Sequence, residues 1–188
     1  MPDALLIIDF QNDFTSGGAL EVPGGDEIAD PVRRLAERFD VVMATRDWHP
    51  PDHSSFETEG GPWPVHCVQG TYGAELHPAM EDVDVDVIVD VGREREDQGY
   101  SGFEKSTLAD ALRERGVDRV FVTGLATDYC VRASAIDAAK EGFDTTVVED
   151  AIRAVNVNPD DGERALEDMK HAGAKVATSD DVLAGVAR

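Results

Sequence analysis

The sequence predicts an α/β protein with a parallel sheet, and two features of the chain carry that prediction. Short apolar runs rich in β-branched residues alternate with segments whose apolar residues recur at helical spacing. No linker, internal repeat or low-complexity segment divides the 188 residues. Such alternation favours a parallel sheet covered by helices on both faces, and we expect residues 1–188 to form a single domain.

Six strands and five helices are expected along the chain. The strands are predicted at residues 4–10, 41–45, 85–91, 119–123, 145–148 and 175–178. The helices are predicted at residues 26–38, 107–115, 128–141, 159–171 and 180–187. The fourth helix has the clearest ends, because Asn158 can cap it, Pro159 suits its first position and Gly173 follows its last turn.

The chain carries a large excess of negative charge. Thirty-nine Asp and Glu residues face 17 Lys and Arg residues, which gives a formal net charge of −22. Nucleic acids and anionic membranes are therefore poor partners. Only four of the basic residues are lysines, and this pattern favours a halophilic protein, since salt screens the repulsion among carboxylates. The alternative is an ordinary acidic cytosolic enzyme.

The cysteine count and the apolar runs bear on the compartment. Two cysteines, Cys67 and Cys130, are too few for a disulfide framework and suit a reducing environment. No apolar run is long enough to span a bilayer, and the first twenty residues lack the pattern of a secretory signal. We therefore expect a cytoplasmic protein.

One long connection breaks the alternation of strands and helices. Residues 46–82 hold four of the five histidines, together with five prolines and both tryptophans, and a loop of this length is usually functional. Asp9 ends the first predicted strand, Asp47 follows the second, and Cys130 lies just beyond the fourth. Because ligands gather at the carboxyl ends of parallel strands, we expect these three residues to meet at one edge.

The loop offers the donors of a metal site. Asp47 and His49 are two residues apart, so in an extended segment they point to the same side, and His66 could supply a third ligand. One carboxylate and two imidazoles suit Zn, Fe, Mn or Co, whereas the alternative is a solvated loop. His53 could complete the metal shell or cap a turn. His77 and His171 are expected to be structural or solvated.

Cys130 is the candidate nucleophile. It follows a strand that ends at Gly124, in the first turn of a predicted helix, where the helix dipole and free N–H groups would stabilise a thiolate. The alternative is a buried cysteine that packs as a small apolar residue, which is our interpretation of Cys67. Asp9, at the end of a neighbouring strand, favours catalysis because it offers a general base.

Several blocks of sequence together resemble one family. They are DFQNDF at 9–14, DWHP at 47–50, WPVHCVQGT at 63–71, YSGF at 100–103 and GLATDYCV at 124–131. Over nearly its whole length the chain resembles the nicotinamidase/pyrazinamidase group of the isochorismatase-like hydrolases. The resemblance implies a three-layer α/β sandwich with a six-stranded, mostly parallel sheet and helices on both faces.

The resemblance also implies roles for individual residues. Asp9 and Cys130 match the catalytic aspartate and cysteine, and the metal ligands match Asp47, His49 and His66. The positions that line the pyridine pocket match Phe14, Leu20, Trp63 and Tyr100. The oxyanion donors match the backbone of Ala126 and Cys130, after a cis peptide bond at Leu125–Ala126.

The implied activity is a metal-dependent cysteine amidase of NAD salvage. It would hydrolyse nicotinamide, or a similar pyridine carboxamide, to nicotinate and ammonia through a thioester. The cofactor would be a divalent metal (Zn, Fe or Mn), with no organic cofactor. Either His53 or Glu59 could be the fourth protein ligand of the metal. The protein could also form a homo-oligomer.

The chain departs from the family at one catalytic position. The family has a lysine twelve residues before the Phe of the Tyr-Ser-x-Phe block, and counting back from Phe103 gives Val91. Arg93 would share the face of Val91 if the strand continued, so we expect Arg93 to be the replacement cation, with Arg95 as the next candidate. Two other functions stay open: hydrolysis of another small amide, and a non-catalytic protein that binds a metal or ligand.

Overall fold

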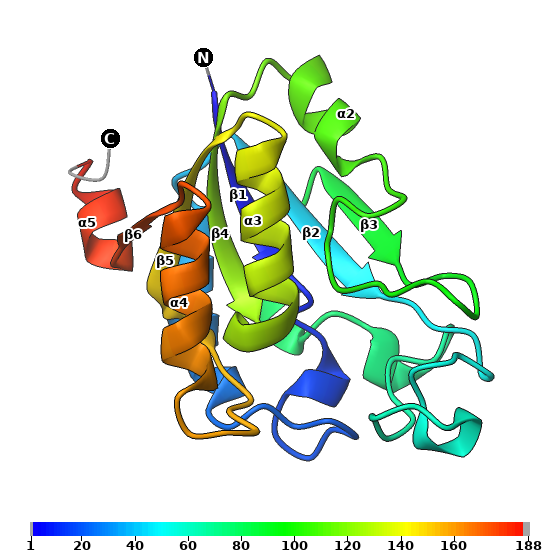
Figure 1. The fold of residues 1–188 in the computed structure, drawn as a ribbon. Helices are drawn as coiled ribbons and strands as arrows, with labels where there is room; N and C mark the ends of the chain where they lie inside the picture. The colour runs from blue at the N-terminus through cyan, green and yellow to red at the C-terminus, as the bar shows by residue number, and fades with distance from the viewer. Residues whose placement is uncertain (1, 186–188) are drawn as a thin grey trace.

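Strand β1 lies in the middle of a six-stranded sheet, and every pair of adjacent strands is parallel (Figure 1). The order is β3-β2-β1-β4-β5-β6. The strands are β1 (Asp3–Ile8), β2 (Val41–Asp47), β3 (Val87–Val91), β4 (Arg119–Leu125), β5 (Asp144–Arg153) and β6 (Lys175–Ala177). This computed structural model describes residues 2–185.

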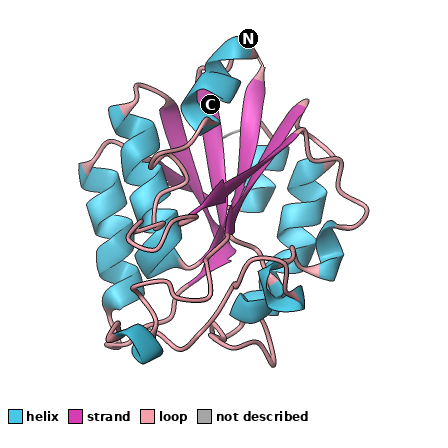
Figure 2. Cartoon of the chain, turned by 90° about the vertical axis from the view of Figure 1, so that its right-hand side faces the viewer, coloured by secondary structure: helices cyan, strands magenta, loops and turns pink. Residues whose placement is uncertain are grey.

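Helices cover both faces of the sheet, which gives three layers (Figure 2). The helices are α1 (Ala29–Ala36), α2 (Leu108–Glu114), α3 (Arg132–Lys140), α4 (Asp161–His171) and α5 (Ser179–Leu183). Single 3-10 turns occur at Asn12–Phe14, Gly25–Ile28, Glu57–Glu59, Tyr72–Ala74 and Pro78–Met80. A π-helical turn, Thr127–Val131, leads into α3. The predicted fold class is confirmed.

Two apolar clusters hold the layers together. Along β1, Leu6 and Ile8 face the cluster that contains the buried side chains of α2, α3 and α4, whereas Leu5 and Ile7 face the cluster that contains those of α1 and α5. Successive residues of a strand point to opposite faces, so an apolar run without polar interruptions is what a strand buried on both sides requires.

The elements begin and end at slightly different residues from those predicted. β1 ends at Ile8 rather than at residue 10, because Asp9 turns the chain with a φ of 45°. α4 begins at Asp161, and the backbone N–H of Asn158 donates to the Asp161 carboxylate, so Asn158 and Pro159 lie in a turn before the helix. The fifth predicted helix ends at residue 187, which lies outside the described residues.

The order of the strands reverses beside β1. The chain moves from β1 outward to β2 and β3, then returns to the other side of β1 as β4. At such a reversal the connections leave in opposite directions and open a crevice at the carboxyl edge. The connection 48–86, between β2 and β3, lies beside this edge. Within residues 2–185, no helix is both long and apolar enough to cross a membrane.

Candidate active site

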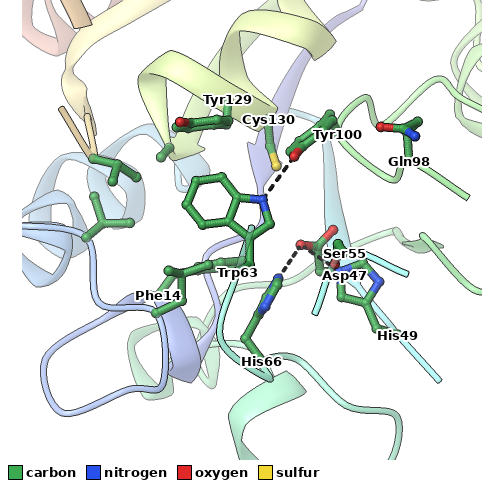
Figure 3. A pocket seen from close by; sticks show the side chains of 14 residues that line it. Phe14, Asp47, His49, Ser55, Trp63, His66, Gln98, Tyr100, Tyr129 and Cys130 are labelled. Atoms are coloured by element: carbon green, nitrogen blue, oxygen red, sulfur yellow. Dashed lines mark hydrogen bonds and ion pairs between the residues drawn. The ribbon is translucent and has the colours of Figure 1, made fainter. Parts of the chain in front are cut away.

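A cavity opens at this carboxyl edge, and the sulfur of Cys130 points into it (Figure 3). All five residues expected to contact a substrate lie on its wall. The residues that line the cavity are Phe14, Leu20, Val22, Asp47, His49, Ser55, Trp63, His66, Gln98, Tyr100, Ala126, Tyr129, Cys130 and Val155. The cis peptide bond expected at Leu125–Ala126 is present.

Five lining residues were not found from the sequence. They are Val22, Ser55, Gln98, Tyr129 and Val155. Tyr129 precedes Cys130 inside a recognised block and could have been found from that neighbourhood. The other four come from separate loops without periodicity, so no sequence signal marks them.

Aromatic side chains form one wall of the cavity. The indole N–H of Trp63 donates to the hydroxyl oxygen of Tyr100 at 3.0 Å. The Trp63 ring also meets the ring of Tyr129 edge to face, with centroids 4.9 Å apart. Such contacts hold flat rings in place, and the wall is therefore suited to a planar ligand.

Three predicted ligands converge at the base of the cavity. Nδ1 of His49 lies 2.9 Å from the Gly92 carbonyl oxygen, and Nδ1 of His66 lies 2.8 Å from that of Pro64. Because a carbonyl only accepts, each Nδ1 carries a proton, and in its neutral form each imidazole presents the lone pair of Nε2 to a cation. The two Nε2 atoms lie 3.3 and 3.8 Å from Oδ2 of Asp47. Two oriented imidazoles around a carboxylate form a donor set for a divalent cation.

Asp47 itself fits a bound cation. Its Oδ1 is buried and has no hydrogen-bond partner among residues 2–185, which leaves a polar atom that a cation would satisfy. Burial alone would raise the pKa of Asp47, but the charge of a protonated His49 and the hydrogen bonds donated by His49 and His66 outweigh it and lower the pKa to about 2. Asp47 is therefore ionised, as a metal ligand must be.

The structure does not present either candidate for a fourth ligand. His53 stacks on His49 with ring centroids 3.9 Å apart, but both of its nitrogens are engaged. Its Nε2 lies 2.8 Å from the Asp97 carbonyl oxygen, and its Nδ1 lies 2.7 Å from Ser55 Oγ. Glu59 pairs with Arg95. The expectation for His53 and Glu59 is corrected: His53 supports the ring of His49, and Glu59 belongs to an exposed ion pair.

Gly92 is required where the connection after β3 passes His49. The carbonyl of this residue orients the His49 ring, and a Cβ atom on it would lie 2.5 Å from that ring. Its φ of 62° is also a conformation that side chains disfavour. A glycine here therefore lets the Gly92 carbonyl approach closely enough to accept a hydrogen bond from Nδ1 of His49.

Side chains in the turn after β1 form hydrogen bonds that hold the backbone around the site in place. Gln11 is completely buried and bonds to the backbone of Asp47. Asn12 donates to the Tyr72 carbonyl oxygen at 2.8 Å, and Oδ2 of Asp13 accepts the N–H of Cys67 at 2.7 Å. These consecutive polar side chains thus connect β1 to β2 and to the loop that carries His66.

Asp9 is buried at the end of β1, beside Cys130. Its Oδ1 accepts a hydrogen bond from the Thr45 hydroxyl group at 2.6 Å. Burial raises the pKa of Asp9 well above its usual value, and the charge of Asp47 raises it further. Hydrogen bonds from Thr45 and from the Cys130 thiol offset only part of this. Asp9 therefore holds a proton more readily than an exposed aspartate does.

Cys130 lies in the π-helical turn after β4 and is 6% exposed. Burial raises the pKa of its thiol well above the usual value, and the negative charges of Asp9 and Asp47 raise it further. The helix start, which is expected to stabilise a thiolate, is therefore opposed by burial and by two carboxylates. The thiol donates a hydrogen bond to Asp9, which gives its proton a direct acceptor.

The expected replacement for the family lysine does not reach this cavity. β3 ends at Val91, and Gly92 then turns the chain, so Arg93 does not continue on the face of Val91. Arg93 is exposed and lines a separate pocket with Asp97 and Lys105. The expectation that Arg93 replaces the family lysine at this cavity is therefore corrected, because the strand does not continue to Arg93. Arg95 is exposed as well.

A parallel α/β sheet whose edge holds a buried thiol, a carboxylate and a three-residue donor set has the components of a metal-assisted hydrolase. The chain belongs to the isochorismatase family, whose domain matches residues 3–181. It is 38% identical to the nicotinamidase of Escherichia coli (strain K12), over 94% of this chain and 95% of that protein. Such relatives place it in the nicotinamidase group.

Solved structures agree with this assignment. The pyrazinamidase of Pyrococcus horikoshii in complex with zinc is 46% identical, with a TM-score of 0.87 over 95% of this chain and 99% of that one. The L. infantum protein PnC1 in complex with nicotinate is 37% identical, with a TM-score of 0.90 over 95% of this chain and 93% of that one.

Proposed function

We propose that the protein is a metal-dependent cysteine amidase that hydrolyses nicotinamide to nicotinate and ammonia. One observation carries the proposal: the Cys130 sulfur lies within 4.8 Å of the Asp9 carboxylate and faces the cavity that also holds Asp47, His49 and His66. The E. coli relative is a nicotinamidase and the L. infantum structure contains nicotinate, which supports a pyridine carboxamide as the substrate.

In the proposed reaction, Asp9 accepts the thiol proton while Sγ of Cys130 attacks the carboxamide carbon. The raised pKa of Asp9 makes its carboxylate a stronger proton acceptor than an exposed one. The tetrahedral intermediate then collapses, the C–N bond breaks, and Asp9 returns the proton to the departing nitrogen, which leaves as ammonia. Water adds to the thioester carbon, which releases nicotinate and restores the thiol.

Backbone and aromatic groups complete the proposed site. The N–H groups of Ala126 and Cys130 are assigned to the developing oxyanion, where fixed donors are most effective. The pyridine ring would lie against the wall formed by Phe14, Trp63 and Tyr100. A flat aromatic ring suits this wall better than an aliphatic amide does.

A divalent cation held by Asp47, His49 and His66 would supply a Lewis acid for the pyridine nitrogen. The two Nε2 atoms, which lie 3.3 and 3.8 Å from Oδ2 of Asp47, support this assignment. The zinc complex of the P. horikoshii relative supports zinc among Zn, Fe, Mn and Co.

The test measures ammonia release from nicotinamide in molar salt, before and after removal of metal by a chelator. Benzamide is the matched control, because it lacks the ring nitrogen and should be a much poorer substrate. The expected result is release that is lost with the metal and regained with Zn²⁺ or Mn²⁺. If the metal-loaded protein releases no ammonia at any salt concentration, the proposed function is wrong.

We also infer that residues 1–188 act as one halophilic, cytoplasmic hydrolase domain. The net charge of −22 supports salt adaptation, and Cys67 and Cys130, both free, support a reducing compartment.

A further inference from the structure

Three buried side chains form a second group of potential metal ligands. Asp9, Asp47 and Cys130 each offer an atom within 4.8 Å of the other two. They are 1%, 5% and 6% exposed, respectively. An ion that bonds oxygen at about 2.0–2.2 Å and sulfur at about 2.3 Å could contact all three after small movements.

The two oxygens of Asp47 are in different situations. Oδ2 faces the two imidazoles, whereas Oδ1 is buried and has no hydrogen-bond partner in the described part of the chain. A carboxylate can bind one cation through each oxygen. Oδ1 therefore stays available after Oδ2 has joined His49 and His66 around a first ion.

The group also lacks a neighbouring lysine or arginine. Among the lining residues found within residues 2–185, none is Lys or Arg, and Val91, at the end of β3, packs in the same apolar cluster as Cys130. Two carboxylates and a thiol buried together attract a cation strongly when no side chain supplies one. The thiol makes the group selective for soft or borderline divalent ions.

We propose that Asp9, Asp47 and Cys130 form a second, inhibitory site for a thiophilic divalent cation such as Zn²⁺ or Cd²⁺, with Asp47 shared between the two ions. The inference rests on the proposed function of the first metal site. Binding forms a bond between the metal and Sγ, breaks the S–H bond and releases that proton to solvent, without oxidation or reduction. An ion at this site occupies the nucleophile and its base, so excess metal stops turnover.

The test titrates metal-free protein with Cd²⁺ in concentrated sodium nitrate and follows thiolate-to-metal charge transfer in the ultraviolet. The wild type should bind two ions and show the thiolate band. Cys130→Ala should bind one ion without the band, whereas Cys67→Ala, the matched control, should keep both ions and the band. Asp9→Asn should weaken the ion that gives the band by roughly tenfold or more. Val91→Lys should weaken the same ion by supplying a competing ammonium group.

Binding of a single ion by the wild type, or a band that persists in Cys130→Ala, would overturn the proposal. So would full ammonia release from nicotinamide with both ions bound. The proposed function has a separate outcome, because protein that releases ammonia with one ion and never binds a second fails only this inference. Protein that binds both ions but releases no ammonia at any metal content fails the proposed function instead.

Discussion

The side-chain amide of Gln11 pairs with both backbone groups of Asp47. Its oxygen accepts the Asp47 N–H at 2.9 Å, and its nitrogen donates to the Asp47 carbonyl at 2.8 Å. The same nitrogen donates to the Ala74 carbonyl at 2.9 Å. A residue that offers no metal-binding group thus fixes the backbone of a proposed ligand.

Gln11→Ala should therefore weaken metal binding by roughly 10- to 100-fold, the usual effect of removing a group that orients a ligand. Competition with a chromophoric chelator measures the affinity. Gln69→Ala is the matched control, because Gln69 bonds the carbonyls of Trp48 and Arg93 but is exposed. Equal metal affinities in the wild type and in Gln11→Ala would show that metal binding by Asp47 does not depend on its hydrogen bonds to Gln11.

Cys130→Ala should abolish turnover and leave the first metal ion and the fold intact, since the variant lacks only the attacking sulfur. Steady-state ammonia release and circular dichroism measure the two properties. Cys67→Ala serves as the comparison, because Cys67 is buried but does not line the cavity. Residual activity above about a hundredth of wild type would reject Cys130 as the nucleophile.

Asp47→Ala, His49→Ala and His66→Ala should each lose bound metal and activity together. Each substitution removes one of three donors, and the anchor for the pyridine nitrogen leaves with the metal. Elemental analysis of purified protein decides the matter, with His171→Ala as an exposed histidine control. Any variant that keeps one ion per chain would remove its residue from the ligand set.

Arg93→Ala should leave kcat within about twofold of wild type, because a charge that is exposed and screened by salt contributes little to a buried reaction centre. Single-turnover kinetics with nicotinamide would test this. A loss of about a hundredfold, the effect of removing an oxyanion-stabilising group, would mean that Arg93 reaches the nucleophile during turnover.

The thermal midpoint of unfolding should rise from dilute buffer to molar salt, because at about 1 M the Debye length is roughly 3 Å and carboxylates no longer repel one another. Three exposed carboxylates before β3 allow a matched variant: Glu81→Gln, Asp82→Asn and Asp84→Asn combined. This variant should be more stable than wild type in dilute buffer and should respond less to salt. A midpoint that is flat or falls with salt in the wild type would contradict salt adaptation.

The sequence predicted the sheet and the meeting of Asp9, Asp47 and Cys130, because both follow from regular physical rules. Strands buried on both faces produce continuous apolar runs, and parallel strands bring their carboxyl ends to one edge. The roles of Phe14 and Trp63 came from the resemblance to a family, since loop residues leave no periodic trace.

The misplaced residues share a different cause. Arg93 was expected to continue the side-chain alternation of β3, but the left-handed φ of Gly92 ends that alternation. A glycine permits such a turn without requiring it, so the sequence does not predict it. The stabilisation of a thiolate expected from the helix start at Cys130 did not take into account burial beside two carboxylates. Burial and chain reversals depend on the assembled fold, so they cannot be predicted from local sequence patterns.

The connection 48–86 contributes no strand to the sheet, yet it carries His49, Ser55, Trp63 and His66. Asp9 and Cys130 instead follow β1 and β4, which are hydrogen-bonded to neighbours on both sides. One continuous segment therefore carries two of the three proposed metal ligands and one residue of the aromatic wall, whereas the bond-breaking pair comes from the centre of the sheet. Exchanging that segment could alter the metal site and part of the substrate wall while the bond-breaking pair is inherited unchanged.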